Sequence, residues 1–296
     1  MSLLKMDRLK RATPWFIKIP AKIVLSRLPV GPRQWQHLNI FRAGTMDTPA
    51  EAFQIFNMHF AGSGLTTLDG CAVVELGPGN SALTALFARS LGAKRTWLVD
   101  AEELASDDTA LFAETERMLS GLNLPVPGVG TAPTMSAALD RLNCTYLTNG
   151  LASLQTIPDG AVDFLFSNAV LEHVRLADFA PLAQEMRRIL KPNGVASHQI
   201  DFKDHLEYAL NNLRFSERLW ESKFMVRSGF YTNRLTWPAM EKLFQDAGFS
   251  VELRTSQLWP DGLPTPQRKM ASPFKDLPAK ELMVKGAHAI LRPLVS

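Results

Sequence analysis

The sequence is poor in cysteine and contains no long apolar run. Its 296 residues include two cysteines, Cys71 and Cys144, too few for a disulfide framework or for a zinc site of their own. No apolar stretch approaches the roughly 18 residues that a membrane-spanning helix needs. Charged residues interrupt the first 30 positions, so we expect no secretory signal there and a reduced, cytoplasmic protein.

A strong net charge is also missing, because 32 Lys and Arg face 29 Asp and Glu and leave a net charge of +3. The charge is nevertheless uneven. Residues 1–45 carry nine basic side chains and one acidic one, so the remainder of the chain is acidic. Since nucleic-acid-binding domains are typically basic over their main body, we expect no nucleic-acid partner.

Residues 1–65 are predicted to form a basic N-terminal helical arm, and residues 66–296 to form the main domain. Basic and apolar positions mix along the start of the arm, which leaves two interpretations open. The arm either lies on anionic lipid, as a peripheral contact at the inner membrane surface, or folds over the domain as a substrate lid. The core-like pattern of residues 35–58 favours the lid.

Beyond residue 70 the apolar pattern alternates between strand and helix, which is typical of an α/β fold with a mostly parallel sheet. Seven strands are predicted, at residues 71–76, 96–99, 144–147, 162–167, 195–202, 249–253 and 282–291. The clearest helices are expected over residues 83–91, 182–190 and 236–247. Two stretches are insertions, at about residues 101–142 and 206–235, and the first should hold two helices.

A glycine loop follows the first predicted strand. Gly77 and Gly79 lie between this strand and a helix, where glycine lets the backbone approach a ligand and the helix N-terminus offers free N–H groups. Asp100 ends the second strand, where a carboxylate can accept hydrogen bonds from ribose hydroxyls. This pattern alone fits a nicotinamide or flavin cofactor as well as other nucleosides.

Glu75 lies two residues before the first glycine and faces the same crevice. A carboxylate there repels a pyrophosphate but suits a cationic ligand. S-adenosyl-L-methionine carries both a sulfonium and an ammonium group, so Glu75 favours this cofactor over a nicotinamide.

Two further segments carry a family resemblance. Residues 157–174, with the sequence IPDGAVDFLFSNAVLEHV, and residues 188–194, RILKPNG, closely resemble hallmarks of class I methyltransferases. The resemblance covers about residues 70–255. It implies a Rossmann-like fold with a seven-stranded, mostly parallel sheet, an antiparallel last strand and S-adenosyl-L-methionine as cofactor.

The same resemblance implies roles for single residues. The methionine end of the cofactor would be lined by Glu75, Gly77 and Gly79. Asp100 would hold the ribose, and Asn168 would lie beside the transferable methyl group. Near residues 149–151 the family often supplies an acid for the adenine amino group, and this sequence has none.

Methyl transfer to a hydroxyl requires alignment of the acceptor and a general base. The candidate catalytic residues follow the fourth and fifth strands: His173, Asp201, Asp204 and His205. An Asp beside a His can orient the imidazole and raise its basicity. The alternatives are that His173 packs at a helix start and that Asp204 and His205 cap the chain after the strand.

Magnesium-dependent family members carry Glu-x-x-Glu-His after the fourth strand. Here the sequence is Ala169-x-x-Glu172-His173, so one ligand is missing. We therefore expect no metal site.

Arg227, Tyr231 and Asn233 are the candidate substrate residues, because they lie in the insertion where family members place substrate-recognition elements. Polar and aromatic groups there suit a sugar or another hydroxylated acceptor, and the alternative is a solvated loop. Residues 201–205 and 231–235 are also similar to methyltransferases associated with bacterial surface-polysaccharide synthesis.

The predicted function is S-adenosylmethionine-dependent methylation, by in-line displacement, of an oxygen on a small-molecule or glycan-type acceptor, with a His/Asp base. Two alternatives stay open. One is a nicotinamide-dependent oxidoreductase that uses the same glycine loop. The other is a degenerate fold that binds a nucleoside without turnover.

Overall fold

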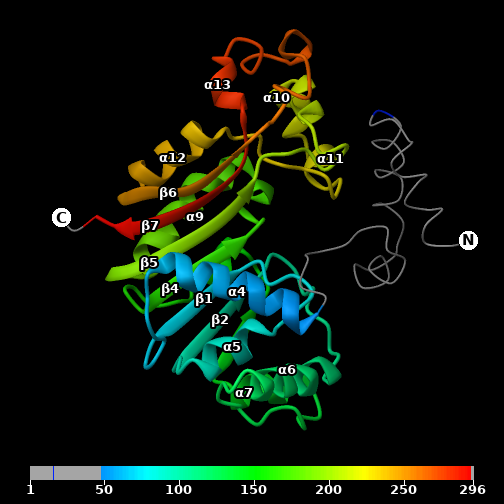
Figure 1. The fold of residues 1–296 in the computed structure, drawn as a ribbon. Helices are drawn as coiled ribbons and strands as arrows, with labels where there is room; N and C mark the ends of the chain where they lie inside the picture. The colour runs from blue at the N-terminus through cyan, green and yellow to red at the C-terminus, as the bar shows by residue number, and fades with distance from the viewer. Residues whose placement is uncertain (1–15, 17–47, 295–296) are drawn as a thin grey trace, which may run out of the picture.

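A seven-stranded sheet forms the centre of the protein in the computed structural model, which describes Phe16 and residues 48–294 (Figure 1). The strand order is β3-β2-β1-β4-β5-β7-β6. The strands span Ala72–Leu76 (β1), Arg95–Val99 (β2), Cys144–Leu147 (β3), Val162–Asn168 (β4), Leu190–Asp201 (β5), Phe249–Leu258 (β6) and Val284–Pro293 (β7). Strands β1 to β5 pair in parallel, whereas β7 is antiparallel to both of its neighbours. The predicted fold class is confirmed.

Helices cover both faces of the sheet (Figure 1). One face carries α4 (Pro49–Ser63), α5 (Thr84–Ser90), α6 (Ala110–Gly121) and α7 (Met135–Arg141). The other carries α8 (Leu151–Leu154), α9 (Leu176–Ile189) and α12 (Trp237–Asp246). Because side chains alternate along a strand, Val73 belongs to the first core and Val74 to the second, so β1 is buried on both faces of the sheet.

Helix α4 lies inside the segment that was predicted as the arm. Thr48 caps its start by accepting a hydrogen bond from the N–H of Glu51 (3.3 Å), and Gly64 ends it in left-handed backbone with a φ of 78°. Phe56, which is 0% exposed, anchors the helix in the core. The other residues before 48, Phe16 excepted, lie outside the described residues, so the arm-and-domain division at residue 65 stays a prediction.

Strand β5 begins earlier than predicted, at Leu190 instead of Val195. Leu190 pairs with Val162, after which the register shifts so that Phe164 pairs with Val195. The four residues 191–194, which the sequence suggested as a turn before the strand, therefore form a bulge within it.

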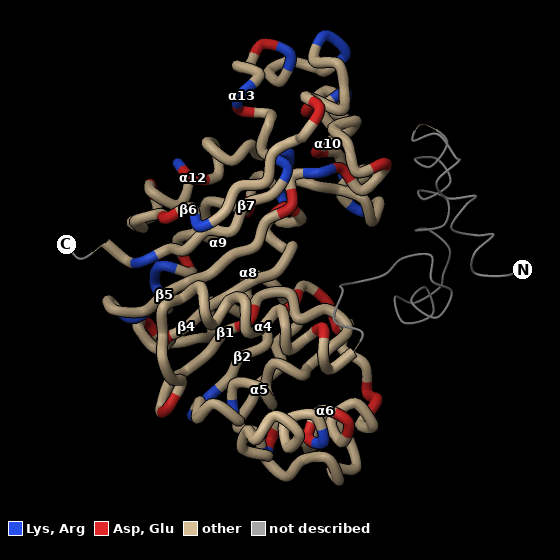
Figure 2. The backbone as a smooth tube through the Cα atoms, in the orientation of Figure 1, with Lys and Arg blue, Asp and Glu red and all other residues tan. Residues whose placement is uncertain are grey.

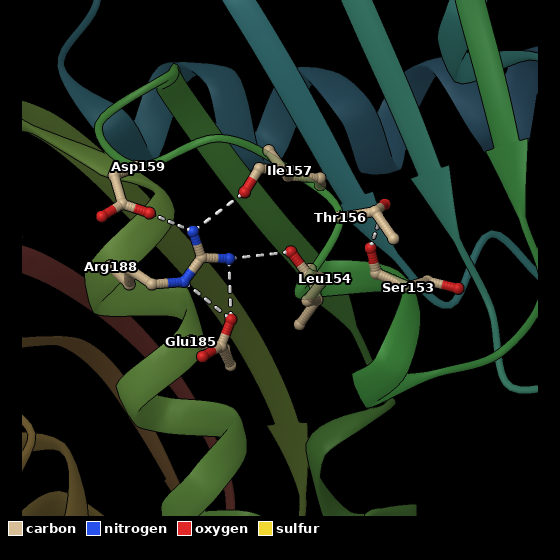
Figure 3. Close-up of polar contacts among 7 residues, drawn as sticks. All are labelled: Ser153, Leu154, Thr156, Ile157, Asp159, Glu185 and Arg188. Atoms are coloured by element: carbon tan, nitrogen blue, oxygen red, sulfur yellow. Dashed lines mark hydrogen bonds and ion pairs between the residues drawn. The ribbon is translucent and has the colours of Figure 1, made fainter.

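Arg188 connects the two segments that carry the family resemblance, residues 157–174 and 188–194. Its guanidinium donates hydrogen bonds to the carbonyl oxygens of Ile157 (2.9 Å) and Leu154 (3.0 Å). It also forms ion pairs with Asp159 and Glu185 (Figure 3). The end of α9 is thereby fastened to the loop that leads into β4.

Two segments distant in sequence, residues 206–235 and 259–283, form a cap at one end of the sheet. Their short helices are η2 (Asn211–Arg214), α10 (Glu217–Trp220), α11 (Lys223–Val226), η3 (Gln267–Lys269) and α13 (Ala279–Leu282). Figure 1 shows α10, α11 and α13 gathered at the same end of the molecule. Leu213 of the first segment packs with Met270 of the second, and the N–H of Ala271 donates to the carbonyl of Leu213 (2.8 Å). The first of these two segments is the insertion that the sequence predicted at residues 206–235.

Figure 2 shows charges of both signs spread along the described chain. Within residues 48–294, no helix is long and apolar enough to cross a membrane.

Candidate active site

The glycine loop and Asp100 meet at the ends of β1 and β2. Gly77 and Gly79 have φ angles of 69° and 64°, a left-handed backbone that favours glycine. The N–H of Gly77 donates to the carbonyl of Val99 (2.8 Å), and the N–H of Gly79 donates to Oδ2 of Asp100 (3.0 Å). Burial raises the pKa of Asp100, an effect that its backbone hydrogen bonds oppose. Three predicted cofactor residues are thus brought to one edge of the sheet.

Glu75 lies directly before this loop and is 1% exposed. Its Oε2 has no hydrogen-bond partner among the described residues. Burial raises the pKa of Glu75 to about 8; the Thr84 hydroxyl opposes this rise and the negative charge of Asp100 adds to it. Because a buried carboxylate oxygen without a partner costs free energy, the site favours a ligand that brings positive charge.

Asn168 ends β4 and is half-buried. The next residue, Ala169, has a φ of 53°, and its N–H donates to the carbonyl of Gln199 (2.8 Å). Left-handed backbone is uncommon outside glycine and clusters at functional sites. Val170 then packs against the glycine loop so closely that a Cβ atom added to Gly77 would lie 2.4 Å from its Cγ2. The end of β4 therefore contacts the predicted cofactor loop.

Asn233 holds the turn after β4, η1 (Leu171–His173), in place. Its backbone N–H donates to the carbonyl of Glu172 (2.7 Å). Its side-chain amide donates to the carbonyls of Leu171 (2.8 Å) and Val174 (3.1 Å). Asn233 is 3% exposed and uses its donors inside the protein, so we infer that it positions the turn.

Tyr231, two residues before Asn233, also forms hydrogen bonds next to this turn. Its hydroxyl accepts a hydrogen bond from the N–H of Leu176 (3.1 Å) and donates to the carboxylate of Glu221 (2.9 Å). Tyr231 is 4% exposed, so its ring offers little surface to an acceptor. Of the three predicted substrate residues, Arg227 is the exposed one.

The His173 ring is oriented by a backbone group. Nδ1 lies 2.9 Å from the carbonyl oxygen of Tyr231. Since a carbonyl only accepts, Nδ1 carries the hydrogen, and Nε2 is left with a lone pair when the ring is neutral. Although His173 reaches the surface, desolvation by the surrounding protein lowers the pKa of its imidazole; the Tyr231 carbonyl and Asp201 oppose this change.

His205 lies against His173, with ring centroids 4.7 Å apart and planes at 82°. Glu172 completes this group: one of its carboxylate oxygens and one ring nitrogen from each histidine all lie within 4.8 Å of one another. We call Glu172, His173 and His205 the His-Glu cluster. Glu172 was not among the predicted site residues, although its position next to His173 was a signal that could have found it.

Asp201 and Asp204 differ in their surroundings. Asp201 is half-buried at the end of β5; its Oδ1 accepts from the N–H of Lys203 (2.8 Å) and its Oδ2 pairs with the Lys203 ammonium (3.2 Å). The carboxylate of Asp204, 1% exposed, accepts four backbone N–H groups, from Leu206, Glu207, Ala209 and Asn211. Asp204 thus caps its loop, the alternative that the sequence left open, and these four hydrogen bonds occupy its carboxylate.

Residues 74–197 match the protein-family model described as a methyltransferase domain. Residues 74–197 are therefore a methyltransferase domain. This match decides the choice of cofactor that the glycine loop had left open, in favour of S-adenosylmethionine. No curated protein matches the sequence significantly.

Several solved structures are similar to this methyltransferase. A putative sarcosine dimethylglycine methyltransferase from Galdieria sulphuraria shares 12% identity at a TM-score of 0.48, over 89% of this chain and 98% of that one. An S-adenosylmethionine-dependent methyltransferase from Mesorhizobium loti shares 16% at a TM-score of 0.44, over 81% and 96%. The Burkholderia thailandensis 1,6-didemethyltoxoflavin-N1-methyltransferase, solved with 1,6-didemethyltoxoflavin and S-adenosylhomocysteine, shares 13% at a TM-score of 0.43, over 83% and 78%.

The residues of the glycine loop fit S-adenosylmethionine. The buried, unpartnered oxygen of Glu75 suits a cationic group, and the left-handed Gly77 and Gly79 allow close approach of the backbone. Asp100 retains lone pairs for ribose hydroxyls beside the two N–H groups that it accepts. At the predicted adenine position, the backbone N–H of Gly150 is already bonded to the carbonyl of Asp100 (2.8 Å).

Proposed function

We propose that this methyltransferase methylates a hydroxyl oxygen of a small-molecule or glycan-type acceptor, and that His173 receives the proton of that hydroxyl. The observation that carries this proposal is the contact of His173 Nδ1 with the Tyr231 carbonyl (2.9 Å). It leaves Nε2 as the nitrogen with a free lone pair, on a turn that adjoins the cofactor loop through Val170.

The lowered pKa of His173 supports this role, because an imidazole must be neutral at working pH to accept a proton. Asp201 stabilises the imidazolium that forms, since its negative charge raises the pKa of the same ring. His205 packs edge-to-face on the ring and limits its rotation. Together these residues hold one proton acceptor in a defined orientation.

The cofactor residues are proposed to provide alignment. Bound S-adenosylmethionine supplies an electrophilic methyl group. Glu75 holds a cationic part of the ligand, Asp100 fixes the ribose, and Asn168 lies at the end of β4, two residues before the Val170 that packs on Gly77. Holding donor and acceptor in line is worth several kcal/mol, up to about 11 in well-oriented systems.

The cap supports a hydroxylated acceptor. Arg227 is exposed on it, and Tyr208 is 74% exposed with a left-handed φ of 56°. An exposed aromatic ring is a surface on which a sugar can stack, and Arg can pair with a phosphate or carboxylate. The similarity to polysaccharide-associated methyltransferases points to the same class, and a basic arm would suit a lipid-linked form of it.

The test uses the full-length protein with S-adenosylmethionine and a panel of sugars, sugar phosphates and lipid-linked sugars, with detection of methylated product by mass spectrometry. His173→Gln should lower kcat by about 10²- to 10⁴-fold and leave S-adenosylhomocysteine binding intact. Lys242→Ala, which removes a surface ion pair on α12, is the control. Full turnover by His173→Gln would contradict the role of His173, and binding without any product would favour a fold without turnover.

A further inference from the structure

The His-Glu cluster contains a carboxylate and two imidazoles, whereas a general base requires only one of these groups. Glu172 and His173 come from the turn after β4, whereas His205 comes from the loop after β5. One donor atom from each lies within 4.8 Å of the other two. Two imidazole nitrogens and a carboxylate oxygen are ligand types that divalent first-row transition metals prefer.

The carboxylate of Glu172 is the second observation. The residue is 2% exposed, and neither carboxylate oxygen has a hydrogen-bond partner among the described residues. The backbone N–H groups of Glu172 itself and of Asp201 compensate its desolvation only in part, and a buried carboxylate in that state is rare. A cation held between Glu172 and the two histidines would supply the missing partner.

The orientation of His173 fits the same interpretation. Histidines that bind metals usually donate their second ring nitrogen to a carbonyl or carboxylate, which fixes the tautomer. The Nδ1 contact with Tyr231 is of this kind, and it leaves Nε2 for an ion. The turn itself is held by Asn233, whose N–H bonds to the carbonyl of Glu172 (2.7 Å).

We propose that Glu172, His173 and His205 bind one divalent transition-metal ion, and that the ion takes the acceptor hydroxyl as a further ligand. The sequence led us to expect no metal, because Ala169 stands where a carboxylate would be needed. The third ligand is instead His205, which the fold brings from 32 positions further along the chain.

The ligand atoms need little adjustment. Around a tetrahedral ion with bonds of about 2.1 Å, donor atoms lie roughly 3.4 Å apart, and side-chain rotation can close the remaining distance. Three protein ligands leave at least one position open, as in catalytic metal sites.

The catalytic part of this inference rests on the proposed methylation of a hydroxyl but replaces His173 as the group that receives the proton, whereas metal binding itself rests on neither. An ion lowers the pKa of a hydroxyl bound to it, so the acceptor proton can pass to solvent. In that state the Nε2 lone pair of His173 binds the ion and does not receive the proton.

Metal binding can be tested without any acceptor. The full-length, tag-free protein is stripped with a chelator and dialysed against Zn²⁺, and bound metal is measured by elemental analysis; Co²⁺ then reports the ligands through its visible absorption. We expect about one ion per chain. Glu172→Gln and His205→Ala should each weaken Zn²⁺ binding at least tenfold, by analogy with the roughly 10- to 100-fold losses caused by changes around metal sites. His37→Ala, a histidine outside the described residues, is the matched control.

Unchanged Zn²⁺ affinity in both variants, or an equal loss in His37→Ala, would overturn the site. Circular dichroism and thermal unfolding of each variant separate loss of ligand from loss of fold; His205→Ala is the safer variant because the residue is half-buried in a loop. Once an acceptor is found, equal turnover by stripped and Zn²⁺-loaded protein would overturn the ion's catalytic role while the proposed function stands. Zn²⁺ binding without methyl transfer would support the site and contradict the function.

Discussion

The hydroxyl oxygen of Ser197 lies 2.8 Å from Nδ1 of His59, a contact that joins β5 to α4 inside the protein. The same oxygen lies 2.9 Å from Nε2 of His288 in β7. Burial lowers the pKa of both histidines, and the neighbouring His288 lowers that of His59 further. His198, bonded to Ser167 (2.7 Å), has its pKa lowered to about 3 by burial and by His288. The packed core therefore requires neutral histidines.

Acid should destabilise the protein through these histidines. Their folded pKa values lie below the ordinary 6.5, so the stability is fully present above pH 6.5 and is lost as pH falls through the window towards 3. At pH 5, His198 alone should cost about 2 kcal/mol of unfolding free energy. Urea unfolding of the wild type and His198→Gln between pH 7.5 and 5 measures this. A pH slope that is identical in the two proteins would contradict the prediction.

Replacing the buried acid of the cofactor loop should stabilise the unliganded protein. The pKa of Glu75 in the folded protein, about 8, exceeds its ordinary value of 4.5. The protonated Glu75 side chain therefore stabilises the folded state fully below pH 4.5, and this contribution is lost as the pH rises towards 8. Glu75→Gln removes this dependence and should gain up to about 3 kcal/mol at pH 7. It should weaken S-adenosylmethionine binding about tenfold or more, since a charge-assisted contact is lost.

Calorimetry and thermal unfolding of the same samples test both halves of that prediction. Glu252→Gln, on the exposed part of β6, is the control for removing one acid. A Glu75→Gln variant that binds the cofactor normally would remove Glu75 from the binding site.

Gly77→Ala should lower stability and cofactor binding together. The new Cβ would lie 2.4 Å from Val170 Cγ2, on a backbone with a φ of 69°. Overpacking of this kind typically costs about 1–3 kcal/mol. Shortening the neighbour with Val170→Ala should recover part of the loss, so a double-mutant cycle should give a coupling of about 0.5 kcal/mol or more. Strict additivity would show that the two residues do not press on each other.

Arg188→Ala should destabilise the fold without changing the cofactor site. It removes the hydrogen bonds to Ile157 and Leu154 and leaves two carbonyls to find water (Figure 3). Because the side chain is 28% exposed, we expect a loss of about 1–2 kcal/mol of unfolding free energy. S-adenosylhomocysteine affinity, measured well below the unfolding temperature, should stay unchanged, and a large fall in it would contradict a purely structural role.

The seven strands and the glycine loop could be predicted because they depend on local sequence. Apolar runs ending in Gly77 and Gly79, or in Asp100, are read directly along the chain. The start of β5 could not, because the pairing of Leu190 with Val162 depends on a bulge set by the neighbouring strand.

Side chains after β5 were harder to place for a related reason. Asp204 and His205 are adjacent, yet one caps four backbone N–H groups and the other lies on His173. The choice between them is made by the loop's own hydrogen bonds, which sequence spacing does not specify. Tyr231 and Asn233 likewise form hydrogen bonds with the turn at residues 171–173, about 60 residues earlier in the chain. No local sequence pattern predicts contacts at this distance.

The cap contains an apolar cluster that is separate from the two cores against the sheet. Leu210, Leu213, Met270 and Phe274 pack with one another, apart from the two cores against the sheet. Changes among these four residues need not be compensated in the two cores against the sheet, whereas Tyr231 and Asn233 of the same cap are tied to the turn at residues 171–173. Exchange of the cap between related chains would change the surface offered to the acceptor and keep the residues that bind the methyl donor.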